Sequence, residues 1–319
     1  MNFMGRFQAS LNIRYHESPW QGLLWALTLY LLASLIIMPI GATIVGLFYG
    51  YGLEEVFQVL SGSSLENASE RAVFRWLQAI NQLATWGLVG LLLLIAVGDF
   101  QKILTPSASR QPLFLSLIVL AVICMMVSIP LVQLITFDAE SFSLPDSFQA
   151  IEESLESSEI LAERLLKKII TEKSFLILAI NILVFAVIPA VCEELFFRGF
   201  IQHTFQRLIS PHAAILLTAV IFSIIHFQVF GLFSRFFLGI LLGYFTYYSG
   251  SLIPSIIAHF SYNAVSIIVA YYQYMEPQGE EIGGSIPLYM GIISFLAMIS
   301  CLFFYFRLSS MGKVDRSDT

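Results

Sequence analysis

Residues 174–206 read SFLILAINILVFAVIPAVCEELFFRGFIQHTFQ. The first part, 174–192, carries no charged side chain, and a helix crosses the hydrocarbon core of a bilayer in about 20 residues. This stretch therefore predicts a transmembrane helix. Glu193, Glu194 and Arg198 follow within the same stretch, where ionisable groups cost free energy and usually serve a pathway or a site.

The whole chain shares this apolar character. Of its 319 residues, 57% are hydrophobic and 12% are charged, and the mean hydropathy is +0.80. An ordinary soluble domain carries roughly 25% charged residues. The alternating segments of about ten residues that mark a membrane β-barrel are not visible. We therefore predict an all-α fold, a polytopic membrane helix bundle.

Uncharged apolar runs predict about eight transmembrane helices. They lie at about 22–49, 76–97, 112–137, 174–206, 212–231, 233–249, 252–272 and 286–306. The fifth and sixth runs are short and Arg235 lies near their junction, so a seven-helix bundle is the alternative.

Three regions follow along the chain. Residues 1–173 hold the N-terminal transmembrane helices and an acidic amphipathic loop at 138–173, residues 174–272 form the core, and residues 273–319 hold the last helix and a tail. Apolar residues between 148 and 170 recur at helical spacing among Glu and Lys, which predicts an amphipathic helix. It could lie on the membrane surface, cover the bundle or stay solvated.

Lys and Arg in short loops indicate the cytoplasmic side of a membrane protein. The residues concerned are Arg6, Arg14, Lys102, Arg110, Arg207, Arg307, Lys313 and Arg316. The intervening segments lean acidic, although Arg71 and Arg75 run against this trend. We expect both termini in the cytoplasm, membrane lipid as a partner, and a bacterial inner membrane as the location. No basic patch suggests nucleic acid, and the three cysteines show neither disulfide nor zinc spacing.

Three of the predicted helices carry polar residues at depth. Glu193 precedes the turn at Ser210–Pro211 and His226 follows it at similar distances, so at about 1.5 Å per residue both would lie roughly 22 to 26 Å from the turn. His259 and Asn263 enter in the seventh run, from the same side. We expect these groups to meet at one level, given a tilt or kink of the seventh helix.

Helical spacing separates their roles. His259 and Asn263 are four residues apart and share a face. Glu194 and Arg198 have the same spacing, which predicts an ion pair that lowers the cost of both charges. Glu193 lies about 100° away from Glu194 and is left for chemistry.

These groups could hydrolyse a peptide bond. Glu193 would activate water, His226 would hold that water or a metal, and His259 with Asn263 would stabilise the oxyanion. The structural alternative is a buried polar network that ties the helices together.

The motifs Glu-Glu-x-x-x-Arg at 193–198, Phe-x-x-x-His at 222–226 and His-x-x-x-Asn at 259–263 resemble, in this order, those of the CAAX protease and bacteriocin-processing family. That family contains the type II CAAX prenyl endopeptidases, and the resemblance covers about 174–270. It implies an eight-helix intramembrane protease in which Glu193 is the catalytic base. Glu194 and Arg198 would support it, and His226, His259 and Asn263 would complete the site.

The resemblance leaves the cofactor and the substrate open. The family has been described both as metalloproteases and as metal-free glutamate proteases, and Glu193, His226 and His259 could form an open zinc site. No His-Glu-x-x-His motif is present, and we expect metal-independent activation of water. The expected substrate is a membrane-associated peptide or protein, either prenylated or of the leader type.

Two other classes of function compete with an intramembrane endopeptidase. A transporter would use buried Glu and His to carry ions, but Pro189 has no evident mate in a second, paired helix. A non-catalytic scaffold or bacteriocin-immunity protein would keep the same residues to bind a peptide.

Overall fold

The computed structural model describes residues 15, 18–98, 103–105, 113–140, 147, 149–170, 172, 174–226, 231–275 and 286–311. Regular structure in these residues is helical, with no strand, which confirms the all-α prediction. Residues Arg6, Arg14, Lys102, Arg110, Lys313 and Arg316, on which the predicted orientation depends, lie outside the described residues.

The chain divides into two compact units. Unit 1 comprises Met1–Phe100, Leu161–Leu208 and Asn263–Gly279, and unit 2 comprises Gln101–Ile160, Ile209–Tyr262 and Glu280–Thr319. The division predicted from the sequence, at 1–173, 174–272 and 273–319, remains a prediction.

Every predicted apolar run coincides with a helix, and in the described part of the chain six helices are long and apolar enough to cross a membrane. These are Pro19–Tyr49, Ala68–Val97, Phe114–Thr136, Phe175–Phe205, Ile253–Gln273 and Leu288–Met311. The fifth and sixth runs form the shorter α14 (Pro211–Ile224) and α15 (Leu232–Ser249), which carries Arg235. The count of eight transmembrane helices remains a prediction.

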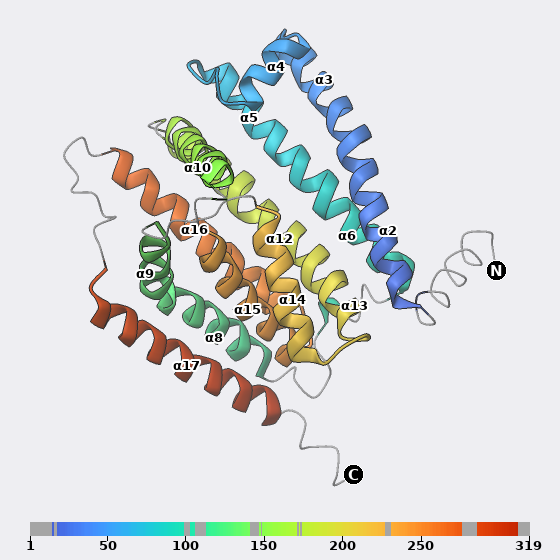
Figure 1. The fold of residues 1–319 in the computed structure, drawn as a ribbon, viewed down its shortest axis with the longest axis vertical. Helices are drawn as coiled ribbons and strands as arrows, with labels where there is room; N and C mark the ends of the chain where they lie inside the picture. The colour runs from blue at the N-terminus through green and yellow to red at the C-terminus, as the bar shows by residue number, and fades with distance from the viewer. Residues whose placement is uncertain are drawn as a thin grey trace. The chain divides into compact units, whose positions relative to one another are not determined.

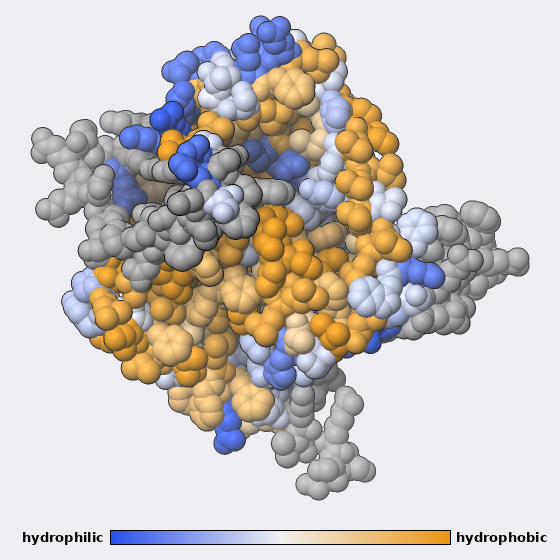
Figure 2. All heavy atoms as spheres, viewed as in Figure 1, coloured by the Kyte–Doolittle hydropathy of each residue, from blue (hydrophilic) through white to orange (hydrophobic). Residues whose placement is uncertain are grey.

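Apolar side chains stay exposed along the long helices, and Figure 2 shows apolar residues in orange over much of the visible surface. In the helix Pro19–Tyr49, Leu24 is 65% exposed and Phe48 is 83% exposed, and in α17 (Leu288–Met311) Phe304 is 61% exposed. Apolar exposure on this scale is unfavourable in water and suits contact with lipid chains. The chain is an integral membrane protein.

Three long helices form the frame of unit 1 (Figure 1). The first consists of α2 (Pro19–Leu32), η1 (Ala33–Ile37) and α3 (Met38–Tyr49). The second consists of α5 (Ala68–Asn81), η2 (Gln82–Leu88) and α6 (Val89–Val97). The third consists of α11 (Phe175–Ile182), η5 (Leu183–Val187), α12 (Ile188–Glu194), η6 (Leu195–Gln202) and α13 (His203–Phe205). The second helix packs between the other two, and the short α4 (Leu53–Leu60) joins the first to the second.

Two π-helical turns of unit 1 precede a proline. Segment η1 ends two residues before Pro39, and η5 ends two residues before Pro189. Proline has no amide hydrogen to donate to the carbonyl four residues earlier, and a widened turn is one way in which a helix accommodates that loss. The third helix thereby continues through Pro189 to the glutamates.

Small residues bring the second and third helices of unit 1 close together. A Cβ on Gly87 would lie 2.7 Å from Cys192 Sγ, and one on Gly90 would lie 2.9 Å from the backbone nitrogen of Phe196. A side chain at Gly90 would therefore push against backbone, which cannot yield cheaply. Such close approach at small residues is typical of helix pairs in membranes.

A cluster of polar residues, here termed the arginine cluster, joins the start of the second helix to the start of the third. It consists of Arg71, Arg75, Glu172 and Asn181. Arg75 donates to Asn181 Oδ1 at 2.7 Å, to the carbonyl of Ile169 at 3.1 Å and to Glu172 Oε1 at 3.2 Å, while Arg71 also binds Glu172.

The predicted amphipathic helix is confirmed as α10 (Gln149–Ile170). Its end belongs to unit 1, where Ile169 joins a core cluster with Val56 and Phe74, and Leu165 packs against that cluster. Of the three predicted placements, covering the bundle therefore describes this end of α10.

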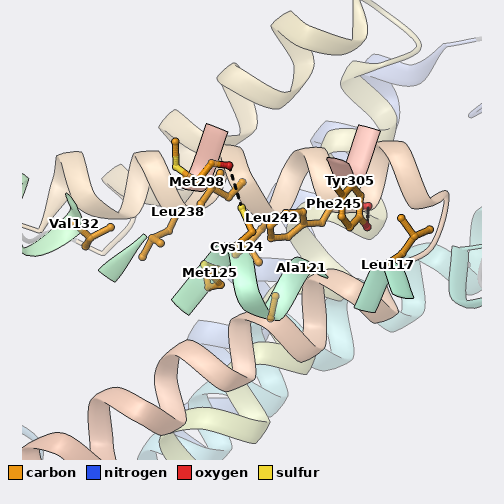
Figure 3. Close-up of a cluster of buried hydrophobic side chains, with 12 residues drawn as sticks. Leu117, Ala121, Cys124, Met125, Val132, Leu238, Leu242, Phe245, Met298 and Tyr305 are labelled. Carbon is orange, nitrogen blue, oxygen red and sulfur yellow. Dashed lines mark hydrogen bonds between the residues drawn. The ribbon is translucent and has the colours of Figure 1, made fainter. Parts of the chain in front are cut away.

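Unit 2 is built around a second apolar cluster (Figure 3). It draws on α8 (Phe114–Val127), α9 (Ile129–Glu140), α15, α17 and the first part of α16 (Ile253–Met275). The Tyr305 hydroxyl donates to the carbonyl of Phe245 at 3.0 Å, which satisfies the one polar atom of a buried ring.

The hairpin of α14 and α15 corrects one predicted boundary. The helix predicted to reach residue 231 ends at Ile224, and His226 lies in the turn that follows. The amide of His226 donates to the carbonyl of Ser223, three residues back, and the Ser223 hydroxyl donates to the carbonyl of Leu232 at the start of α15. The bond from His226 to Ser223 tightens the last turn, and the helix ends there.

Candidate active site

The three motif residues of unit 1, Glu193, Glu194 and Arg198, are all buried. They lie in α12 and η6 and have exposed fractions of 4%, 0% and 2%. Carboxylates and guanidinium groups are rarely buried unless they are paired. We refer to these three residues as the glutamate cluster.

The predicted ion pair within this cluster is confirmed. Arg198 Nη1 donates to Glu194 Oε1 at 2.6 Å, with both side chains almost fully buried. A charge-assisted hydrogen bond of this length compensates part of the desolvation of both groups. Glu194 and Arg198 thus form one nearly neutral unit beside Glu193.

Glu193 accepts a hydrogen bond that the sequence argument missed. Gln82, the first residue of η2, donates from Nε2 to Glu193 Oε1 at 3.1 Å. The signal that could have revealed it is the polar pair Asn81-Gln82, which interrupts the apolar run 76–97.

Aromatic rings pack together on the helical turn that follows the two glutamates. The Trp86 ring lies 5.1 Å from the ring of Phe196 and 5.2 Å from that of Phe197, measured between centroids. Phe197 is 1% exposed. Electrostatic interactions are stronger in such an apolar, buried environment than in water.

In unit 2, the tautomer of His226 follows from its hydrogen bond. His226 Nδ1 lies 2.7 Å from the carbonyl oxygen of Phe222. A carbonyl can only accept, so Nδ1 carries the proton and, in the neutral ring, Nε2 is the acceptor. This is the state in which a histidine can accept a proton from water or bind a metal.

The Phe222 ring contacts the rings of both histidines of unit 2. Its ring centroid lies 5.0 Å from that of His226 and 6.2 Å from that of His259. His259 is 7% exposed and lies on α16, four residues before the half-buried Asn263.

The six predicted site residues therefore fall into two sets. Glu193, Glu194 and Arg198 belong to unit 1, and His226 and His259 belong to unit 2. The boundary between the units falls within α16, directly before Asn263, which belongs to unit 1. Their meeting at one level remains a prediction.

A zinc site from Glu193, His226 and His259 also remains a prediction. Among the described residues, no group of three or more His, Cys, Asp or Glu side chains is arranged to hold a metal ion. We therefore derive no chemical step through a metal.

A comparison with protein families finds a match that spans all of these residues. Residues 175–265 match the family model described as type II CAAX prenyl endopeptidase Rce1-like. The chain contains an Rce1-like domain. The resemblance read from the motifs is thereby confirmed, and the Rce1-like domain includes every residue of the predicted site, from Glu193 to Asn263.

The Rce1-like domain covers less than a third of the chain, from α11 to the middle of α16. No curated protein and no solved structure gave a significant match. The family thus supports a membrane protease, and the chemistry has to be argued from the residues themselves.

Proposed function

We propose that this protein is an intramembrane endopeptidase in which Glu193 activates a water molecule. The observation that carries the proposal is the unequal environment of two adjacent buried carboxylates. Glu194 is bound by the guanidinium of Arg198, whereas Glu193 accepts from the neutral amide of Gln82. Carboxylates placed in such different environments take different roles in many hydrolases.

The reaction begins when the Glu193 carboxylate takes a proton from water. The water oxygen adds to the carbonyl carbon of the scissile peptide bond, and negative charge moves to the carbonyl oxygen. His259 and Asn263 are proposed to donate hydrogen bonds to this oxyanion. His226, with Nε2 as an acceptor, is proposed to orient the water from a second side.

The intermediate then collapses and the carbon–nitrogen bond breaks. The proton held by Glu193 passes to the leaving nitrogen, which gives one carboxylic acid and one amine and returns Glu193 to its ionised form. Burial favours both steps, because fixed donors interact more strongly with a developing charge in a medium of low dielectric constant.

The proposed substrate is a membrane-associated peptide, either prenylated near its C-terminus or of the leader type. The description of the matching family supports the prenylated class. The proposed setting is a bacterial inner membrane, with both termini in the cytoplasm and lipid around the bundle.

The test is peptide cleavage by the purified full-length chain in liposomes. Substrates are a farnesylated CAAX-type peptide, the same peptide without its lipid, and a leader-type peptide. We expect Glu193→Gln to lower kcat by about 10²- to 10⁴-fold, the range for loss of a general base. The matched control is Glu54→Gln, the same change at an exposed position of α4, which should cleave like the wild type.

A chelator arm separates the two mechanisms. Cleavage that survives a strong chelator but is lost in Glu193→Gln supports metal-free activation, whereas loss with the chelator and recovery with Zn²⁺ supports the zinc alternative. Absence of cleavage of all three peptides by the wild type would favour the scaffold function.

A further inference from the structure

We infer that Gln82 is a positioning residue that orients both the Glu193 carboxylate and the water it activates. The inference rests on the proposed hydrolytic function. Gln82 lies outside the Rce1-like domain, on the second long helix of unit 1, and reaches the glutamate cluster across the interface between the second and third helices.

The chemistry of the contact fixes the orientation of the Gln82 amide. An ionised carboxylate accepts hydrogen bonds and cannot donate them, so the amide must present its nitrogen to Glu193. The 3.1 Å bond joins Gln82 Nε2 to Glu193 Oε1. The amide oxygen of Gln82 therefore does not face the ionised carboxylate.

That oxygen is the second observation. Gln82 Oε1 is buried and has no hydrogen-bond partner among the described protein groups. Buried amide oxygens in native proteins are nearly always satisfied by protein or by water. A water molecule beside Glu193 meets the need, since one of its O–H bonds can face the carboxylate and the other can face Gln82 Oε1.

Holding both hydrogens has a consequence for the reaction. The proton facing Glu193 is transferred, the hydrogen facing Gln82 stays on the oxygen, and an oxygen lone pair is left to attack the carbonyl carbon. Restricting the water in this way reduces the orientational entropy that is lost on reaching the transition state.

Close packing near Gln82 sets the separation of the second and third helices. Gly87 and Gly90 lie on the same helix and approach Cys192 and the backbone of Phe196, on either side of the glutamate pair. The position of Gln82 is thus set by the contact of two helices rather than by a loop, which suits precise positioning.

The alternative is a structural role for Gln82, in which its amide forms a hydrogen bond that holds the two helices together, as buried amides often do in membranes. The two roles differ in kinetics. A structural amide affects the amount and stability of folded protein, whereas a positioning amide lowers kcat at nearly unchanged KM.

The experiment compares Gln82→Met with Gln78→Met in the full-length chain in liposomes. Gln78 lies one turn earlier on the same helix, so its replacement matches the chemical change. We expect Gln82→Met to lower kcat by about 10- to 100-fold, the usual cost of losing a group that orients a ligand, with KM and the unfolding temperature close to the wild type. Gln78→Met should leave kcat unchanged.

A double variant completes the test. If Gln82 acts through Glu193, then Gln82→Met with Glu193→Gln should be no less active than Glu193→Gln alone. A Gln82→Met variant with unchanged kcat, or losses that multiply in the double variant, would overturn the inference. The proposed function would survive either result, because it fails on different evidence, namely full activity of Glu193→Gln or no cleavage by the wild type. If Gln82→Met does not fold, Gln82→Asn keeps the amide but withdraws it from Glu193 by one methylene group, and the same expectations apply to it.

Discussion

Unit 1 contains two clusters of charged residues, one partly buried and one fully buried, and they differ in the balance of charge. In the arginine cluster, two guanidinium groups share the carboxylate of Glu172 and also bind neutral oxygens, such as Asn181 Oδ1. In the glutamate cluster, two carboxylates accompany the single guanidinium of Arg198. The first cluster lies where helices begin, and the second lies within a long apolar helix.

The difference indicates which cluster performs chemistry. The surplus positive charge of the arginine cluster is satisfied in part by a carbonyl at the end of a helix, because Arg75 donates to Ile169, the penultimate residue of α10. Arg198 interacts electrostatically with both carboxylates, but one guanidinium cannot neutralise two of them within an apolar helix, so the retention of the second carboxylate favours a functional explanation. The arginine cluster should therefore govern stability, and the glutamate cluster should govern stability through Glu194 and activity through Glu193.

The largest effect on stability is expected for Arg198→Ala. It leaves Glu194 buried without its guanidinium, at a cost of about 3 to 5 kcal/mol in the free energy of unfolding. Denaturant or thermal unfolding in detergent measures it. The double variant Glu194→Gln with Arg198→Met should recover most of the loss, since neither charge remains. A stable but inactive Arg198→Ala variant would instead place Arg198 in the chemistry.

A smaller loss is expected for Arg75→Met. Asn181 Oδ1 loses its donor in a buried position, at roughly 1 to 3 kcal/mol, whereas the carbonyl of Ile169 keeps the hydrogen bond from Asn181 Nδ2. Activity per folded molecule should not change. Arg71→Met is the control, because Arg71 is more exposed and its loss should cost about 1 kcal/mol or less. Equal losses for the two variants would contradict this ranking.

Much of the fold follows from the sequence, because length and apolarity decide where a helix can cross a bilayer. The predicted runs coincide with helices, and the spacing of Glu194 and Arg198 was enough to predict their ion pair. Local periodicity fixes such features without knowledge of the rest of the chain.

Contacts between distant segments could not be predicted in this way. Gln82 and Glu193 are 111 residues apart, and no local pattern reveals which face of one helix meets the other. Near the early end of α14, the Ser223 hydroxyl donates to a carbonyl in the next helix, a contact that no local pattern reveals. Arg71 and Arg75 ran against the charge bias because their partner, Glu172, lies about 100 residues away.

The smallest expected effect concerns pH and the arginine cluster. Burial raises the pKa of Glu172, but the hydrogen bonds and charges of Arg71 and Arg75 outweigh it and hold the pKa below its ordinary value of 4.5. Because the pKa of Glu172 is lower in the folded protein than in the unfolded chain, the ionised carboxylate stabilises the fold at pH values above its unfolded-state pKa. This contribution is lost as the pH falls through its folded-state pKa. At pH values below about 4.5, the unfolding temperature of the wild type should therefore decrease more steeply with falling pH than that of Glu172→Gln.

Glu66→Gln, which removes an exposed partner of Lys168, is the matched control and should retain the wild-type slope. Parallel curves for wild type and Glu172→Gln would show that the two arginines do not stabilise the ionised carboxylate, and the contrast between the two clusters would then rest on the glutamates alone.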